Sequence, residues 1–159
     1  VEMTRFQPLG RRPIDGGNID GLFCQIPTGD YIAQCNEQQF LILQIESPEA
    51  LANVEEIAAV PGFNALLFGA GDFSHLSGKA GQVGCAETVV ARKRVAAAAR
   101  ANGKFAMTPG LIAPWEEQAA EGYNVFNLGA DVVGIGDYFR SKVAEFGKLP
   151  LTQTKSVYR

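Results

Sequence analysis

The sequence predicts a parallel α/β fold. Two apolar runs, residues 40–45 and 64–68, contain few polar side chains, as strands buried on both faces of a sheet do. Segments with a helical spacing of apolar residues follow each run, and glycine or proline marks most changes of segment. This alternation of strands and helices is typical of parallel sheets whose strands are joined by helices.

The first part of the chain is predicted to be a long loop. Residues 1–21 are rich in proline and glycine, and we place them over the catalytic end of the sheet. Arg11 and Arg12 in this loop are candidates for binding a substrate carboxylate, or they are solvated charges, which is the interpretation we favour for Arg12. A helical turn is expected at residues 30–33, capped by Thr28 or Asp30.

The middle of the chain supplies two of the predicted strands. After the strand at residues 40–45, Ser47 is the expected N-cap of a helix that runs to residue 60. The strand at 64–68 ends in a glycine-rich turn, and residues 73–84 are predicted to form a further loop. That loop contains His75, the only histidine, which we interpret as a local loop residue rather than a general base.

The remaining chain continues the same alternation. We expect helices at residues 85–101, 114–121 and 131–146, short strands at 104–107 and 123–128, and a C-terminal tail at 147–159. Asp131 is the expected N-cap of the last helix. The 159 residues suit a single domain. They are too few for a complete (β/α)₈ barrel, which typically needs about 250 residues.

Composition excludes several classes of function. The net charge is −3, and the basic cluster at residues 92–94 is interpreted as a solvated helix face, so no nucleic-acid partner is expected. The three cysteines lack CxxC spacing, which favours a reducing, cytoplasmic compartment over a disulfide framework or zinc site. No apolar run approaches the roughly 20 residues that a membrane span needs, and no signal peptide is visible.

Two carboxylates follow the first two predicted strands. Glu46 comes directly after residues 40–45, and Asp72 follows the glycine-rich turn after residues 64–68. Parallel strands bring both acids to the edge of the sheet where such folds carry their sites. Neighbouring carboxylates repel unless a cation or a shared proton compensates them, and a few oxygen ligands suit Mg²⁺ or Mn²⁺.

Each acid also has a simpler interpretation. Glu46 taken alone could merely interact favourably with the dipole of the helix that follows it. Asp72 could cap a turn together with Ser74. The glycine-rich turn between them would let backbone amides approach a carboxylate or an enolate oxygen. It is not a phosphate loop, since it lacks the GxxxxGK[ST] pattern.

The residues around the two acids resemble a known family. Gln44-Ile45-Glu46 and the segment Gly69-Ala70-Gly71-Asp72-Phe73-Ser74 are similar to the paired signature of the metal-dependent 2-oxo acid aldolases. That family includes 2-dehydro-3-deoxyglucarate aldolase, 4-hydroxy-2-oxoheptanedioate aldolase and fungal macrophomate synthase. Residues 6–12 resemble its aromatic-Pro-Pro-x-Gly-x-Arg loop, and residues 129–131 resemble its last-strand turn. The resemblance covers almost all of this chain but only the C-terminal part of a family member.

The resemblance implies a (β/α)₈ TIM barrel, of which this chain supplies roughly the C-terminal five strands. It implies a lyase in which Glu46 and Asp72 bind Mg²⁺ (or Mn²⁺ or Co²⁺), Gln44 touches the substrate, and the amides of Gly71 and Asp72 hold its carboxylate. The implied substrate is a small 2-oxo acid that reacts through a metal-bound pyruvate enolate, in aldol cleavage or addition or in oxaloacetate decarboxylation. A homo-oligomer, with a hexamer as the candidate, is also implied, and the family's catalytic His and Arg are expected outside this chain.

Several alternatives stay open. Differences at residues 11–17 and in the tail favour the macrophomate synthase branch, which is implied to add an enolate made from oxaloacetate to a 2-pyrone. No lysine is placed at a strand end, which disfavours aldolases that form a Schiff base. The chain could instead be a non-catalytic half-barrel fragment or binding module. It could also be a phosphate-binding (β/α)₈ enzyme that uses the turn at residues 129–131.

Overall fold

The structure is a computed structural model that describes residues 1–110 and 112–149. It divides the chain into two compact units, the first covering Val1–Asn127 and the second beginning at Leu128. The predicted single domain over residues 1–159 stays a prediction. Of the predicted tail at 147–159, the part from residue 150 onward lies outside the described residues.

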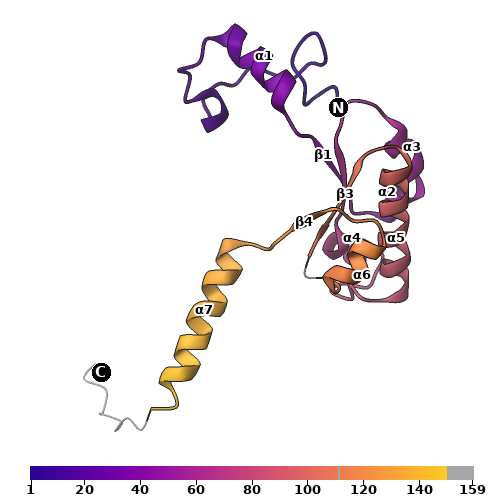
Figure 1. Cartoon of the computed structure of the whole chain (residues 1–159), viewed down its shortest axis with the longest axis vertical. Helices are drawn as coiled ribbons and strands as arrows, with labels where there is room; N and C mark the ends of the chain where they lie inside the picture. The colour runs from indigo at the N-terminus through magenta and orange to yellow at the C-terminus, as the bar shows by residue number, and fades with distance from the viewer. Residues whose placement is uncertain (111, 150–159) are drawn as a thin grey trace. The chain divides into compact units, whose positions relative to one another are not determined.

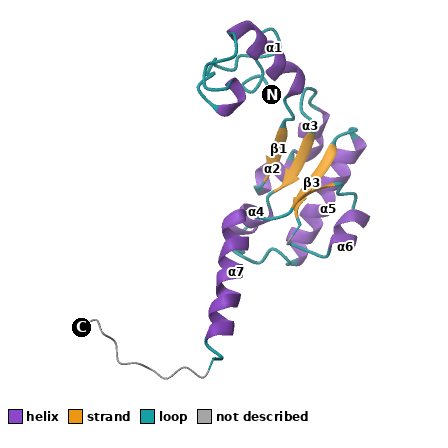
Figure 2. Cartoon of the chain, turned by 60° about the vertical axis from the view of Figure 1, so that its left-hand side comes forward, coloured by secondary structure: helices purple, strands orange, loops and turns teal. Residues whose placement is uncertain are grey.

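The first unit is built on one sheet (Figure 2), in which the strands run parallel in the order β1-β2-β3-β4. The strands are β1 (Ile42–Ile45), β2 (Ala65–Phe68), β3 (Phe105–Pro109) and β4 (Val125–Asn127). The predicted α/β class with a parallel sheet is therefore confirmed. The described residues contain four strands, whereas the resemblance implied roughly five, and residues 1–21 form turns and one short 3-10 helix, η1 (Ile19–Gly21).

Helices α2 to α6 lie on one side of this sheet (Figure 1). The helices of the chain are α1 (Thr28–Gln38), α2 (Pro48–Ala52), α3 (Val54–Ala59), α4 (Ala70–Leu76), α5 (Ala86–Ala101), α6 (Trp115–Ala120) and α7 (Asp131–Phe146). The core forms where they meet the strands, with Val54, Leu66, Phe68 and Val95 each fully buried. Burying this apolar surface is the main force that holds the helices against the sheet.

The predicted helix at residues 47–60 is interrupted. Its start is confirmed, since the Ser47 hydroxyl accepts a hydrogen bond from the Ala50 amide at 3.0 Å and Pro48 is the first helical residue. Asn53 then leaves the helical conformation, with φ −107° and ψ 15°, and separates α2 from α3. The side chain of Asn53 donates a hydrogen bond to the Glu49 carbonyl at 2.9 Å. This bond competes with the backbone hydrogen bonds of a continuous helix.

Two predicted caps were wrong. Pro27, not Thr28 or Asp30, is the N-cap of α1, which is longer than the single turn expected. Ala130 is the N-cap of α7, and Asp131 is the first helical residue. The Asp131 carboxylate accepts a hydrogen bond from the adjacent Val132 amide at 2.7 Å, so the acid still serves the helix start.

The predicted loop at residues 73–84 begins as helix. Gly69 is the N-cap of α4, which includes His75, and the Phe73 amide donates to the Gly69 carbonyl at 2.9 Å. Phe73 is buried against Phe68, with 5.4 Å between ring centroids, and this packing favours the helix despite the glycines before it. The buried Ser74 hydroxyl donates to the Gly71 carbonyl within α4 at 2.8 Å and accepts a hydrogen bond from the Gly81 amide at 3.2 Å, which ties the following loop to α4.

The first strand is not buried on both faces as predicted. Ile45 is 2% exposed and packs in the core, but Ile42 is 37% exposed and Gln44 is also exposed. The reason is topological, because β1 is an edge strand that pairs only with β2 among the described strands. An apolar run is therefore a good predictor of the strand but not of which faces are covered.

The basic cluster at residues 92–94 is only partly solvated. Arg92 is 2% exposed, and its guanidinium donates to Glu121 at 2.7 and 2.6 Å and to Glu117 at 2.6 Å. The Tyr123 hydroxyl donates to the Arg92 carbonyl at 2.8 Å. The solvated-face prediction was therefore wrong for Arg92, which joins α5 to α6, and is confirmed for the exposed Lys93 and Arg94.

Candidate active site

Gln44 and Glu46 meet over Gly69 at the carboxyl-end edge of β1 and β2. The Gly69 amide donates to the Ile45 carbonyl at 2.9 Å, so the pairing of the two strands continues past their ends. A Cβ atom at Gly69 would lie 2.7 Å from the Gln44 Nε2 and 2.8 Å from the Glu46 Cβ. Only glycine leaves room there for both side chains.

The side chains of Gln44 and Glu46 are bonded to each other. The Gln44 Nε2 donates to the Glu46 Oε2 at 2.5 Å. Residues two apart along a strand share one face, which explains how the strand brings the amide beside the carboxylate. The amide holds the carboxylate in one orientation and leaves its other oxygen available for another ligand.

Asp72 and Gly71 lie in the first turn of α4, which starts at the end of β2. Both residues are exposed. A Cβ atom at Gly71 would meet no other atom within 4 Å, so there is open space beside this residue. The structure therefore brings Gln44, Glu46, Gly71 and Asp72 to the same edge of the sheet, and their assignment as a site stays a prediction.

This donor set fits a hard divalent cation. Glu46 and Asp72 offer carboxylate oxygens, and neither forms an ion pair with a lysine or arginine within the described part of the chain. Among residues 1–110 and 112–149, no group of three or more His, Cys, Asp or Glu side chains could hold a metal ion. Mg²⁺ is suited to such a site, because it often uses one or two protein carboxylates and keeps several waters.

The other predicted candidates have different surroundings. His75 is exposed on α4, and Arg11 is exposed and paired with Glu2 at 2.7 Å. Arg12 donates to Asp20 at 3.2 Å and to the Tyr31 hydroxyl at 3.1 Å, and its guanidinium lies 4.6 Å from the centre of the Phe6 ring. The prediction that Arg12 is merely solvated was wrong.

Sequence reasoning missed one feature of this edge and left a second one open. The close approach at Gly69 is invisible in the sequence, although a glycine directly after a predicted strand could have drawn attention to it. Trp115 could line a site or pack its large ring, and packing was the interpretation we favoured, yet the residue is 42% exposed. The signal that could have found it is its position directly after the loop that follows a predicted strand.

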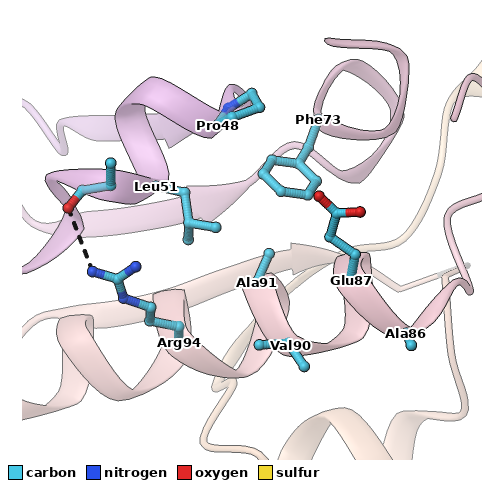
Figure 3. Close-up of a pocket in the computed structure, with 9 residues that line it drawn as sticks. Pro48, Leu51, Phe73, Ala86, Glu87, Val90, Ala91 and Arg94 are labelled. Atoms are coloured by element: carbon cyan, nitrogen blue, oxygen red, sulfur yellow. Dashed lines mark hydrogen bonds between the residues drawn. The ribbon is translucent and has the colours of Figure 1, made fainter. Parts of the chain in front are cut away.

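A pocket between the helices lies elsewhere. It has a volume of about 450 Å³ and is lined by α2, α4 and α5, and it includes none of the four predicted site residues. Figure 3 shows Leu51, Phe73 and Val90 around it, with Arg94 at one side. Its lining is mainly apolar and comes from the helices that cover the sheet. We therefore place the candidate site at the strand ends rather than in this cavity.

Comparison with known proteins identifies the relatives of this chain. The sequence profile described as "HpcH/HpaI aldolase/citrate lyase" matches residues 2–135. The chain belongs to the HpcH/HpaI aldolase/citrate lyase family. A hydroxypyruvate/pyruvate aldolase of Delftia acidovorans is 39% identical over 120 residues, which are 75% of this chain and 43% of the relative. A 5-keto-4-deoxy-D-glucarate aldolase of Klebsiella pneumoniae is 32% identical over 136 residues, covering 86% of this chain and 50% of the relative.

Solved structures of HpcH/HpaI proteins share this fold. A family protein from Burkholderia cenocepacia aligns with a TM-score of 0.77 and 28% identity, covering 92% of this chain and 58% of that one. Macrophomate synthase aligns with a TM-score of 0.72 and 26% identity over 92% of this chain and 52% of that one. The chain therefore spans about half the length of the curated relatives it matches. None of the helices in the described ranges is long and apolar enough to cross a membrane.

Proposed function

We propose that this chain is the metal-binding part of a divalent-metal-dependent lyase that acts on the carbon–carbon bonds of small 2-oxo acids. The observation that carries the proposal is the meeting of Gln44 and Glu46 over Gly69, at the sheet edge that also presents Asp72. Membership of an aldolase and lyase family supports the class of reaction. We further propose that the four strands form half of a (β/α)₈ barrel, in line with the family's solved structures.

Each site residue has a proposed role. Glu46 and Asp72 would hold Mg²⁺, or Mn²⁺ or Co²⁺ in its place. When bound, the ion would supply Lewis-acid stabilisation of negative charge on a 2-oxo acid. Gln44 orients the Glu46 carboxylate through its hydrogen bond and presents its amide to the substrate. The open space at Gly71 would let a substrate carboxylate approach the amides of Gly71 and Asp72.

A pyruvate-type compound is the proposed substrate. The names of the two aldolase relatives, one of them for hydroxypyruvate and pyruvate, support this choice. Oxaloacetate decarboxylation is the simplest related reaction, since the bond to the departing CO₂ breaks, its electron pair forms the enolate of pyruvate, and a proton then restores the methyl group. Addition to a 2-pyrone, as in the macrophomate synthase branch, is a narrower proposal supported by a structural neighbour at 26% identity.

Metal affinity tests the proposed site directly. We expect Mn²⁺ or Mg²⁺ titrated calorimetrically to bind the chain, and Glu46→Gln or Asp72→Asn to weaken binding by about tenfold or more, because each removes one of two charged ligands. Glu49→Gln is the matched control, since Glu49 is an exposed acid in the first turn of α2. Unchanged metal affinity in both site variants would contradict the proposed metal site.

Turnover is the second test. Oxaloacetate decarboxylation should depend on Mg²⁺ and should be abolished by EDTA and restored by excess metal. If decarboxylation is equally fast in EDTA, the metal-dependent reaction is not the function of this chain.

A second candidate is a non-catalytic half-barrel or binding module. The partly exposed edge strand β1 favours it, because a half sheet leaves Ile42 and Gln44 open to a partner. Metal binding without any metal-dependent decarboxylation would favour this candidate. We also propose a homo-oligomer, up to a hexamer, and its mass in solution would test that.

A further inference from the structure

We propose that Trp115 is a specificity-determining residue that contacts the second substrate, the acceptor carbonyl compound of the aldol reaction. The structure assigns it an acceptor with an apolar substituent beside the reacting carbonyl. This inference rests on the proposed function, and it names a substrate class for that same site.

Trp115 lies at the same edge of the sheet as the proposed metal ligands. It is the first residue of α6, and a short loop separates it from the end of β3. β3 pairs in parallel with β2, and β2 leads into α4 with Asp72. Loops that follow neighbouring parallel strands line one common site in barrels of this kind. Trp115 thus follows the strand that neighbours the one leading to Asp72, at the same edge of the sheet.

The indole ring is held over Gly110, the residue directly after β3. A Cβ atom at Gly110 would lie 1.8 Å from the Trp115 Cη2 and 2.0 Å from its Cζ3, so only glycine admits the ring. The ring also meets Phe126 of β4 edge to face, with 5.3 Å between centroids and an angle of 72°. These contacts fix the ring, yet 42% of the residue remains exposed. A rigid aromatic surface that stays open at a substrate edge is well suited to contact a ligand.

Gln118 is the positioning residue for this surface. It is fully buried on α6, and its Nε2 donates to the Ala113 carbonyl at 2.8 Å and to the Gly110 carbonyl at 3.3 Å. These two carbonyls belong to the segment between β3 and α6, so Gln118 ties this segment to the helix that Trp115 begins. Glu117 and Glu121, on either side of Gln118 in the helix, are both bound to the buried Arg92. The α5–α6 ion pairs thereby fix the rotation of α6 and hence the place of Gln118 and Trp115.

The chemistry of this surface selects an apolar acceptor. The face of an indole ring binds apolar groups by packing against them, and it offers no charged group that could bind a polar acceptor. We therefore expect cyclohexanecarbaldehyde to be preferred to glycolaldehyde, since the latter has no apolar group to place on the ring.

The test uses the fact that Trp115 is the only tryptophan of the chain. In the presence of Mg²⁺, cyclohexanecarbaldehyde should change the tryptophan emission in a saturable way, and glycolaldehyde should change it much less. Trp115→Ala should raise the KM for cyclohexanecarbaldehyde by about tenfold, since a packed aromatic contact is lost. This effect should exceed its effect on oxaloacetate decarboxylation, which needs no acceptor, and Trp115→Phe should recover most of the affinity.

The matched control is Phe40→Ala. Phe40 is 49% exposed and packs on Phe105 with 5.6 Å between ring centroids, but it precedes β1 and so lies at the opposite end of the sheet. The KM for either aldehyde should be unchanged in this variant. Gln118→Met, which keeps the length of the side chain and loses its two hydrogen bonds, should shift the emission to longer wavelength and raise the acceptor KM more than it lowers kcat.

The outcomes separate this inference from the proposed function. If the chain lacks metal-dependent decarboxylation, the proposed function fails and the inference fails with it. If decarboxylation is present but Trp115→Ala leaves the KM values of both aldehydes unchanged, only the inference is overturned. An emission that does not respond to cyclohexanecarbaldehyde also overturns it. If Gln118→Met has the same tryptophan emission and the same acceptor KM as the natural chain, Gln118 is not the positioning residue.

Discussion

Two regions of this protein each hold a pair of carboxylates, and the two pairs differ in what compensates their negative charge. Between α5 and α6, Glu117 and Glu121 share the buried guanidinium of Arg92. At the ends of β1 and β2, Glu46 and Asp72 have no such cation among the described residues, and Glu46 is held by the neutral amide of Gln44. A protein cation therefore compensates the carboxylates of the first region but not, among the described residues, those of the second.

The difference agrees with the roles that we propose for the two pairs. In the first region the compensated pair joins two helices, so its energy is part of folding. In the second region the two carboxylates lie at an open edge of the sheet, where the proposed metal ion would supply the positive charge. The same residue types thus have different proposed roles, and the presence of a protein cation distinguishes the two regions.

The largest effect should come from removing the internal cation. Arg92→Met leaves Glu121, whose side chain is 7% exposed, without its partner. Breaking a buried ion pair from one side typically costs about 3–5 kcal/mol, and we expect a loss of that size in the free energy of unfolding. Urea unfolding followed by circular dichroism measures it.

The control for this change is Arg94→Met. Arg94 lies on the same helix as Arg92 and binds Glu55 of α3 at 2.6 Å, but both side chains of this pair are exposed. Because exposed pairs contribute little, we expect a much smaller loss than for Arg92→Met. Equal losses in the two variants would contradict the contrast between buried and exposed pairs.

An intermediate effect is expected at Gly69. In Gly69→Ala the new methyl group would collide with the Gln44 and Glu46 side chains, so both must move. We expect about 1–3 kcal/mol lower stability from the overpacking, together with weaker Mg²⁺ binding because Glu46 is displaced. Gly71→Ala is the matched variant, since its methyl group meets nothing within 4 Å. Thermal unfolding and Mg²⁺ titration of the two variants should therefore diverge, and identical behaviour would mean that Gly69 is not a close contact.

The smallest effect concerns a third charged group, around Arg12. Burial, followed by the hydrogen bond to Asp20, raises the pKa of the Tyr31 hydroxyl to about 12. The folded state therefore favours the neutral phenol, relative to an unfolded value of about 10. This contribution to the free energy of unfolding is complete below pH 10 and is lost as the pH rises through 12.

Tyr31→Phe removes that pH dependence. The stability difference between the natural chain and the variant should be largest at pH 8 and should shrink by pH 11, which urea unfolding at both values measures. Tyr123→Phe gives a useful comparison, because burial also raises the pKa of Tyr123. Parallel pH profiles for the natural chain and Tyr31→Phe would show that the Tyr31 hydroxyl does not titrate in this range.

Much of the fold was predictable because local signals agreed with tertiary packing. Ser47 and Pro48 begin a helix as their chemistry requires, and helix α5 ends at Asn102 and Gly103 as expected. The position of Glu46 and Asp72 at one edge of the sheet was predictable in outline, since two acids after two parallel strands must reach the same side. These features depend on residues that are near one another in the sequence.

The failures depend on partners that are distant in the sequence. The burial of Arg92 requires two glutamates on a helix that forms later in the chain, so a local cluster of basic residues looks solvated. Helix α4 forms because Phe73 packs on Phe68, which outweighs the weak helix propensity of the glycines around its start. The exposure of Ile42 depends on the strand order, which an apolar run does not encode.

The pairing of β1 with β2 has a consequence for insertions and deletions. Side chains alternate between the two faces of a strand, so removing one residue from β1 would turn the amide of Gln44 and the carboxylate of Glu46 away from Gly69. The same deletion in residues 77–84, which lie in a loop, would leave that alternation intact. Length changes in descendants of this chain should therefore accumulate in its loops, while the spacing between residues 44 and 46 stays fixed even where the sequence around it diverges.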